Sequence, residues 1–449
     1  MISIVFLISC IGFTIAGEGG FVYLINLSGS NWKKTHQEYY AMKNWGFPTL
    51  VKTGEAELVY IEFGNFPFLH VSHAQVEYEL VGTEGQSFQV LAHGRPNRLE
   101  VVYNNLEIDG HPKGMSRNLG WRHNGDTNVI IIERNGTYTG NSLDTANWMN
   151  NNIEALGTRP LKQISIPGSH DAGMSKLDGH TAFGRACNVL TQSHSIGKQL
   201  NLGIRYFDIR PVIGNGGKFL TGHYTEIPGS WQGGNGQSIA SIINDLNVFT
   251  KDHNELIMIK LSHSINTDFH YRKFTQAEWE KLFQELDAIN YLYSNDESDV
   301  HLDQITLDDY TNHGSRASVV IIVDDPNSKV ELGRRTGRGY FMPSSLDIFD
   351  DYSESNHWGT MIHDQIKKMK QHSDKQYFLL SWTLTQSDVQ AVLCKPTVRD
   401  LADKANNQLG KLLYNEVSTS SFPNIILIDN VKDTNVALMA LAINTKITL

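Results

Sequence analysis

Three polar clusters between residues 163 and 224 carry side chains suited to proton transfer at an anionic centre. His170 and Asp171 stand in the motif SHDAG, Asp208 and Arg210 stand in FDIR, and His223 stands in TGHY. An unperturbed histidine titrates near neutrality, so two of them can serve as a base and an acid. A guanidinium offers a planar fork of donors that suits phosphate, and the aspartates can orient or polarise these groups.

Each cluster follows a short apolar run. The runs contain Ile164 with Ile166, then Ile204 with Tyr206 and Phe207, then Phe219 with Leu220. Runs of this length between turn residues are typical of buried strands. If the strands are parallel neighbours, their carboxyl ends meet at one rim, where parallel α/β folds place their chemistry. We therefore expect all three clusters to share one pocket.

In this order, IPGSHDAG, RYFDIR and GHY resemble the X region of phosphatidylinositol-specific phospholipases C, in its bacterial and fungal branch. The similarity runs from about Asn147 to the C-terminus and is strongest over the first three runs. The resemblance implies a phosphodiesterase that cleaves phosphatidylinositol, or a GPI-type glycolipid, to diacylglycerol and inositol cyclic phosphate. It also implies a phosphoinositide lipid at a membrane surface as the partner.

The resemblance assigns a role to each motif residue. His170 would be the general base on the inositol 2-hydroxyl, and His223 the general acid for the diacylglycerol oxygen, with Asp171 beside it. Arg210 would hold the phosphate, and Asp208 would support that cluster.

Further positions match the family less closely. Asp429, in LIDNV, would hydrogen-bond His170, although such a carboxylate is more often a loop cap or a solvated group. Asp350 and Tyr352 would contact the inositol head group, with a turn and a core aromatic as the alternative. Lys260 would be a basic substrate contact at the end of its strand.

Other chemistries lack their signatures. His180, His194, His263 and His301 stand outside any motif and are interpreted as structural, and Ser381 lacks the pattern of a nucleophile elbow. No set of residues has zinc-site spacing. Calcium-dependent members of the superfamily have carboxylates where Arg210 stands here, so we expect no metal and no cofactor.

Two functional alternatives stay open at this point. One is a metal-dependent glycerophosphodiesterase or an enzyme similar to sphingomyelinase D, and Arg210 argues against both. The other is a lipid- or glycan-binding relative with a degraded site, and retention of both histidines argues against that.

The region from 141 to 449 alternates strands with helices. Eight apolar runs begin near Ile164, Ile204, Phe219, Leu256, Val319, Tyr340, Phe378 and Ile425. Eight strands with intervening helices predict a (β/α)₈ barrel of the TIM type. The helices after the first three strands are short or missing, so the barrel should be imperfect.

The region from 17 to 140 has a different pattern. Short alternating runs such as AELVYIEF, AQVEYEL and SFQVLA are separated by Gly, Asn, Pro and Asp. Such runs predict an all-β, sandwich-like accessory domain. A packing module is the simpler interpretation of its role, and lipid or sugar binding is the alternative.

The apolar run of residues 1–16, which ends in small residues, predicts a secretory signal peptide cleaved after Ala16. Leu7–Cys10 also resembles a bacterial lipobox. We therefore expect a secreted protein. The formal net charge of −10 argues against nucleic acid as the main partner, and also against simple electrostatic capture by an anionic membrane. We also expect a monomer.

Several single residues carry further predictions. Cys187 and Cys394 remain after signal removal and could form one disulfide in an oxidising compartment, with two free thiols as the alternative. Sequons at Asn26 and Asn135 would carry glycans in a eukaryotic source. Trp231 lies in a stretch predicted to be a Gly-rich loop just after His223, near the mouth of the pocket, where it could touch lipid, with a buried core tryptophan as the alternative.

Overall fold

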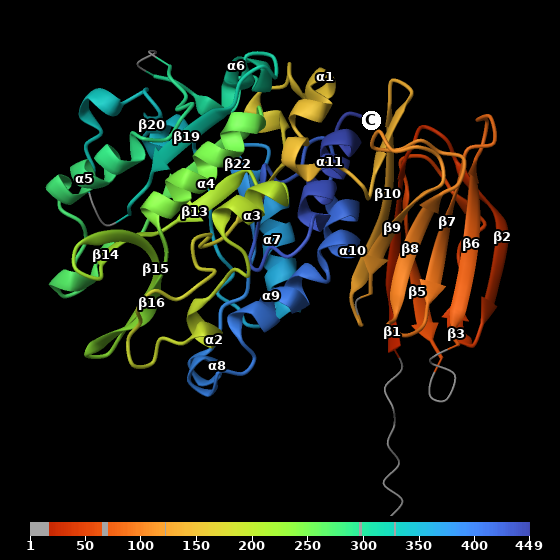
Figure 1. Cartoon of the computed structure of the whole chain (residues 1–449), viewed down its shortest axis with the longest axis horizontal. Helices are drawn as coiled ribbons and strands as arrows, with labels where there is room; N and C mark the ends of the chain where they lie inside the picture. Colours follow the sequence, from red (N-terminus) through yellow and green to blue (C-terminus); the bar gives the residue numbers. More distant parts are fainter. Residues whose placement is uncertain (1–17, 65–70, 122, 296–298, 327–328) are drawn as a thin grey trace, which may run out of the picture. The chain divides into compact units, whose positions relative to one another are not determined.

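The chain forms two compact units (Figure 1). The computed structural model describes residues 18–64, 71–121, 123–295, 299–326 and 329–449, so the predicted signal peptide lies outside the described residues. Unit 1 lies within residues 18–129, and unit 2 begins at Ile130 and also takes in Leu27–Gly29. The division falls inside strand β10 (Asp126–Arg134), N-terminal to the boundary predicted near Gly140.

The N-terminal strands form two sheets built mainly from antiparallel strand pairs, which confirms the prediction of an all-β region. One sheet has the order β11-β10-β1-β5-β3 and the other β4-β2-β6-β7-β8-β9. The alternating sequence pattern predicts strands because one side of each strand packs on the core. Strand β6 shows this, since its residues alternate between exposed or half-buried and buried positions along its whole length. The remaining strands are β1 (Glu18–Leu27), β2 (Trp32–Tyr40), β3 (Met42–Trp45), β4 (Leu50–Val51), β5 (Ala56–Phe63), β6 (His73–Leu80), β7 (Ser87–His93), β8 (Arg98–Tyr103), β9 (Met115–Gly120) and β11 (Thr137–Gly140).

Unit 2 is built on an eight-stranded sheet with the order β20-β19-β17-β13-β12-β23-β22-β21. All its neighbouring strands run parallel, and β20 and β21 are the two edges of a curled, open barrel. Strands β19 and β22 are buried along their whole length, as a sheet covered on both faces requires. The strands are β12 (Ile166–Ser169), β13 (Tyr206–Ile209), β17 (Leu256–Leu261), β19 (Ser318–Val323), β20 (Tyr340–Phe341), β21 (Ile348–Phe349), β22 (Tyr377–Trp382) and β23 (Ile425–Ile428).

The prediction of an imperfect barrel is confirmed, but two of its strand assignments are wrong. The run at Phe219 does not enter the barrel. It forms β15 (Lys218–Ile227), which pairs antiparallel with β14 (Pro211–Gly214) and β16 (Ser230–Ser238) in a separate sheet with β18 (Ile265–Asn266). The run at Tyr340 supplies two barrel strands, β20 and β21. The total of eight is therefore reached through two errors that offset each other.

Helices cover the outside of the open barrel (Figure 1). A capping box opens α5, where Thr275 and Glu278 satisfy each other's backbone N–H groups. Asn407 ends α9 and separates it from the short helix α10. The α-helices are α1 (Ile153–Leu156), α2 (Ala186–Val189), α3 (Ile196–Asn201), α4 (Ile239–Asp252), α5 (Gln276–Leu286), α6 (Leu307–Thr311), α7 (Trp358–His372), α8 (Asp388–Leu393), α9 (Val398–Asn406), α10 (Leu409–Leu413) and α11 (Asn435–Lys446).

No helix in the described ranges is long and apolar enough to span a bilayer.

Candidate active site

The carboxyl ends of neighbouring strands β12 and β23 bring His170 and Asp429 together. Ser169 pairs with Ile428, so the residues that follow each of them leave the sheet side by side. The Nδ1 atom of His170 lies 2.8 Å from Oδ1 of Asp429. Asp429 is a buried carboxylate, and such a partner fixes the histidine tautomer with its proton on Nδ1. The lone pair of Nε2 is then available to accept a proton.

Arg210 lies against that second nitrogen. Its Nη2 atom is 2.8 Å from His170 Nε2, and its Nε donates to Oδ2 of Asp208 at 3.3 Å. Asp171 Oδ2 lies 3.9 Å from Nη1 of the same guanidinium. The arginine is thus held between two aspartates and directed at the histidine, and it lies where a bound phosphate would meet the base.

His223 approaches from the separate small sheet rather than from a barrel strand. Its Nδ1 atom lies 2.9 Å from Oδ2 of Asp171, at ion-pair distance. The two atoms are not aligned as a hydrogen bond, and neither oxygen of the buried Asp171 carboxylate has a hydrogen-bond donor among the described residues. The three sequence clusters therefore do share one site, although the third reaches it by a β-hairpin.

Charges and burial shift the protonation of this cluster. Burial alone would lower the pKa of His170, but the charges of Asp429 and Asp208 and the hydrogen bond to Asp429 outweigh it and raise that pKa. Burial would raise the pKa of Asp208, yet Arg210 and His170 hold it well below its ordinary value. Burial would lower the pKa of Arg210, but the charges of Asp171 and Asp208 outweigh burial and raise that pKa above its ordinary value. At neutral pH the aspartate is therefore ionised and the guanidinium charged.

Lys260 forms a second polar group beside the first. Its Nζ atom lies 2.9 Å from Asp350 Oδ2 and 3.0 Å from Asp324 Oδ2. Both carboxylates raise the pKa of Lys260 against the effect of burial. Tyr352 lies at the same edge, with its ring centroid 5.5 Å from that of His170. The structure thus brings all of the predicted head-group residues close to the histidine and arginine cluster.

Hydrogen bonds from helix α7 hold the segment that carries Asp350 and Tyr352. Gln365 is fully buried, and its Nε2 donates to the Asp351 carbonyl at 2.9 Å and to Ser353 Oγ at 3.0 Å. Its Oε1 accepts the Ser381 N–H of strand β22 at 2.9 Å. One buried amide therefore links this segment to a central strand.

Four residues of this site were missed by the sequence reasoning. Asp324 follows strand β19 in VIIVDD, and the same rule of polar residues at carboxyl strand ends would have found it. Ser262 donates to Asp208 Oδ1 at 3.0 Å, and His263 Nδ1 lies 2.9 Å from Ser262 Oγ. His263, interpreted from sequence as structural, is therefore linked to the site through one hydroxyl. Gln365 gives no sequence signal, since its role depends on tertiary contacts.

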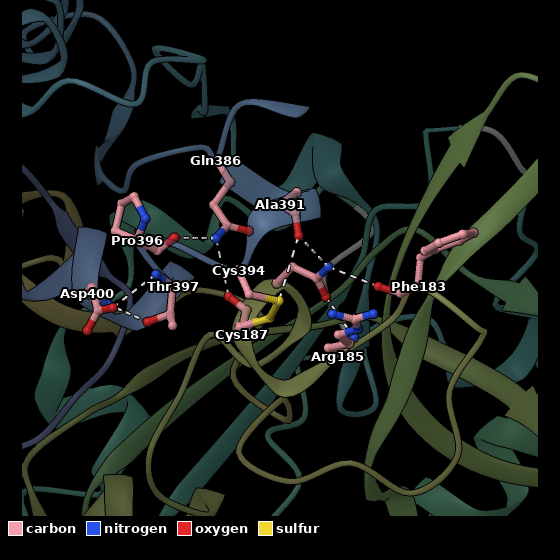
Figure 2. Close-up of a disulfide and its surroundings, with 10 residues drawn as sticks. Phe183, Arg185, Cys187, Gln386, Ala391, Cys394, Pro396, Thr397 and Asp400 are labelled. Atoms are coloured by element: carbon pink, nitrogen blue, oxygen red, sulfur yellow. Dashed lines mark hydrogen bonds between the residues drawn. A yellow bond between two sulfur atoms is a disulfide. The ribbon is translucent and has the colours of Figure 1, made fainter. Parts of the chain in front are cut away.

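The remaining single-residue predictions have mixed outcomes. Cys187 and Cys394 are joined by a disulfide (Figure 2). The sequon at Asn26 is unusable, because this side chain is fully buried and donates to the Ser30 and Val51 carbonyls. Asn135 lies exposed in the β10–β11 turn, and its glycosylation stays a prediction.

Trp231 does not lie in a loop, as predicted, but in strand β16. Its ring stacks on Tyr271 with centroids 5.7 Å apart, and the residue is half-buried. Its contact with lipid stays a prediction. His180, His194 and His301 form no part of the described cluster.

Comparison with known proteins supports the family resemblance. No family model matches the chain. A curated protein, a PI-PLC X domain-containing protein of Dictyostelium discoideum, is 35% identical over 86 residues. The match spans 15% of this chain and 15% of the length of that relative. It confirms, for this short stretch, the predicted resemblance to the X-domain family of phosphatidylinositol-specific phospholipases C.

Solved structures with a similar fold include two bacterial phospholipases. The phosphatidylinositol-specific phospholipase C of Listeria monocytogenes is 20% identical, with a TM-score of 0.46 over 67% of this chain and 99% of that chain. A mutant of the phosphatidylinositol-specific phospholipase C of Staphylococcus aureus is 15% identical, with a TM-score of 0.47 over 66% of this chain and 96% of that chain.

Proposed function

We propose that this chain is a phosphodiesterase of the phosphatidylinositol-specific phospholipase C type. Its substrate would be phosphatidylinositol or a GPI-type glycolipid, and its products diacylglycerol and inositol cyclic phosphate. One observation carries the proposal. A single guanidinium, Arg210, lies between a histidine oriented by Asp429 and a second histidine paired with Asp171.

Each step of that reaction has a group in place. His170 Nε2 takes the proton of the inositol 2-hydroxyl as that oxygen bonds to phosphorus, and Asp429 stabilises the imidazolium that forms. Arg210 turns from Nε2 to the phosphoryl oxygens and offsets the charge that develops there. The bond from phosphorus to the diacylglycerol oxygen breaks, and His223 gives its proton to that oxygen. No water is consumed, and a cyclic diester remains.

The Lys260 group would hold the inositol ring. Lys260 can donate to ring hydroxyls, whereas Asp324 and Asp350 can accept from them. Asp350 Oδ1 is buried without a hydrogen-bond partner among the described residues, so it has capacity for a ligand hydroxyl. Tyr352, whose ring lies near His170, can pack on the apolar face of a sugar ring.

Charge repulsion favours this mechanism over a metal-dependent one. A divalent cation at the phosphate position would lie beside a guanidinium in a site of reduced dielectric. Metal independence is part of the proposal. Peripheral action at a membrane and secretion are further parts, and the Cys187–Cys394 disulfide supports an oxidising compartment.

The test uses purified protein, phosphatidylinositol in detergent micelles and excess EDTA, followed by phosphorus NMR. We expect the substrate diester resonance to be replaced first by that of a five-membered cyclic phosphate. Protein carrying His170→Ala, purified in parallel, controls for contaminating phospholipase. Formation of phosphatidic acid, or turnover only after Ca²⁺ or Mg²⁺ is added, would contradict the proposal and favour the metal-dependent alternative.

A further inference from the structure

A histidine that no step of the proposed reaction uses lies just past the end of strand β17. His263 follows Leu261 and Ser262, and the chain then enters β18, so the turn at His263 passes from the barrel sheet to the small sheet. Its φ is 53°, in the left-handed region that glycine and asparagine adopt with less strain. Residues held in this region are concentrated at functional sites. The imidazole at this turn therefore needs a reason beyond the turn itself.

Two hydrogen bonds lead from His263 into the candidate active site. The Ser262 hydroxyl is buried and donates to Oδ1 of Asp208 at 3.0 Å. His263 Nδ1 lies 2.9 Å from the same hydroxyl oxygen. A serine hydroxyl has one proton, and the ionised Asp208 receives it, so the oxygen can only accept from the ring. The imidazole proton therefore lies on Nδ1, and the bonds run in one direction, from His263 through Ser262 to Asp208.

The bond from Ser262 completes the set of donors to Asp208. Oδ2 of Asp208 accepts from Arg210 Nε at 3.3 Å and from the Asp171 backbone N–H at 3.1 Å, whereas Oδ1 accepts from Ser262. A carboxylate held at both oxygens cannot rotate without losing a donor, and rotation would carry Oδ2 away from the guanidinium. The direction in which Arg210 faces His170 therefore depends on the bond at Oδ1.

His263 supplies this bond as a neutral donor. Although the residue is exposed, partial burial of its ring and the charge of Arg210 lower its pKa. Asp208 opposes this shift, and Lys273 and Lys260 add to it. A neutral ring strengthens the hold on Asp208 without placing another positive charge beside Arg210. The charge of the guanidinium is therefore kept for a bound anion.

We propose that His263 is a positioning residue for the phosphate-binding arginine. By donating through Ser262 to Asp208, it holds that carboxylate, and with it Arg210, in the orientation that meets a phosphate. The assignment of phosphate to Arg210 rests on the proposed function, whereas the hydrogen bonds that position the guanidinium do not depend on any reaction.

Three variants test this role by turnover of phosphatidylinositol in detergent micelles. His263→Ala should lower kcat about tenfold to a hundredfold, because the guanidinium loses its alignment. His263→Asn should keep most of the rate, since its amide N–H can replace Nδ1–H and asparagine tolerates the left-handed turn. His270→Ala is the matched control, because His270 is exposed, has a φ of 55° and forms no side-chain bond with any described residue.

A cut in the middle of the chain of bonds separates positioning from direct contact with substrate. Ser262→Ala should lower kcat at least as much as His263→Ala does. Added to Ser262→Ala, His263→Ala should then cost less than about twofold more, because the connection is already lost. Fold losses that multiply in the double variant would mean that His263 acts on the substrate itself and would overturn the proposal. Equal rates of His263→Ala and His270→Ala would overturn it as well.

Nitrogen NMR reads the same bonds without turnover. At mildly alkaline pH, long-range ¹H–¹⁵N spectra should show neutral His263 with its proton on Nδ1, assigned by the loss of its signals in His263→Ala. Ser262→Ala should move that proton to Nε2, because the acceptor at Nδ1 is gone. The Arg210 Nε–H signal, assigned by its loss in Arg210→Lys, should shift in His263→Ala and not in His270→Ala.

The two kinds of measurement distinguish failure of this proposal from failure of the proposed function. Wild-type protein that leaves phosphatidylinositol intact would count against the function, and the NMR signals would still decide the positioning role. An Nε2–H tautomer of His263 in the wild type, or an Arg210 signal that stays in place in His263→Ala, would overturn the proposal even in an active enzyme. Should Ser262→Ala fail to fold, the Arg210 signal in His263→Ala decides.

Discussion

The guanidinium of Arg210 donates to Nε2 of His170 across 2.8 Å, on the one ring nitrogen that Asp429 leaves free. That contact requires neutral His170, with its proton on Nδ1. The base is therefore held in its working tautomer, and its lone pair points to the place where Arg210 would meet phosphate. A substrate must draw Arg210 away before His170 can accept a proton, so phosphate binding and activation of the base are coupled.

Replacing Asp429 with asparagine should move the acid limb of the pH–rate profile. The charge of Asp429 raises the pKa of His170, so its removal lowers that pKa. Because the base must be neutral, activity falls when pH drops through this pKa, and in Asp429→Asn the fall occurs at lower pH. The plateau rate should drop by about tenfold to a hundredfold, since the imidazolium loses its counter-charge. A plot of kcat/KM against pH checks both effects, and an unmoved acid limb would disprove the pairing.

The charge of Arg210 should make added metal unnecessary. We expect activity to be unchanged by excess EDTA and by added Ca²⁺, because the guanidinium already offsets the phosphoryl charge. Arg210→Lys keeps one positive charge but loses the donor fork, so its rate should fall at least about a hundredfold. Recovery of Arg210→Lys by Ca²⁺ would show that a metal can act at this position. Loss of wild-type activity in chelator would count against the arginine assignment itself.

Gln365 should act on substrate affinity more than on chemistry. Gln365→Leu removes the buried amide that links Ser381 to the segment carrying Asp350 and Tyr352, at a cost of about 1–3 kcal/mol in stability. We expect KM for phosphatidylinositol to rise about tenfold and kcat to change less than about threefold. Gln371→Leu, at an exposed site on the same helix, is the control. An unchanged KM with a lowered melting temperature would leave Gln365 a purely structural residue.

Glu278 offers a test of stability away from the site. Hydrogen bonds from Arg272, then from Thr275 and Asn266, lower the pKa of Glu278 to about 2. Because its pKa is lowered, ionised Glu278 stabilises the folded protein at every pH above the ordinary glutamate pKa of 4.5. This contribution is lost as the pH falls through about 2. Glu278→Gln should therefore unfold about 1–2 kcal/mol more easily at pH 7, where the capping box loses its charge. In urea unfolding, the difference in free energy of unfolding between wild type and Glu278→Gln should decrease below pH 4.5. A difference that stays constant with pH would contradict the lowered pKa of Glu278.

The strand ends were the part of the site that sequence could predict. His170, Asp208 and Lys260 stand at or just past the carboxyl ends of buried runs, and parallel packing brings such ends together. Phe219 shows the limit of the method. Its apolar run reads like any barrel strand, but pairing with β14 and β16 sends it into another sheet. Periodicity reports burial of a strand and not the identity of its neighbours.

Contacts between residues distant in sequence could not be predicted from the sequence either. Gln365 and Asn188 have no local pattern, because their partners lie in other elements. The burial of Asn26 was hidden as well, since its sequon is a purely local signal and its amide partner Val51 lies on another strand.

The central claim is that His170 and His223 divide the work of base and acid, and the leaving group can separate the two roles. A soluble inositol phosphodiester of nitrophenol needs no proton on its departing oxygen, whereas a diester of an aliphatic alcohol does. On the alkyl diester, His170→Ala and His223→Ala should each lower kcat at least about a hundredfold, with native circular dichroism.

On the nitrophenyl diester, the account predicts that His223→Ala recovers most of its rate while His170→Ala stays at least about a hundredfold impaired. Equal defects of the two variants on both substrates would contradict the division of roles, and near-wild-type turnover in either variant on the alkyl diester would remove the mechanism.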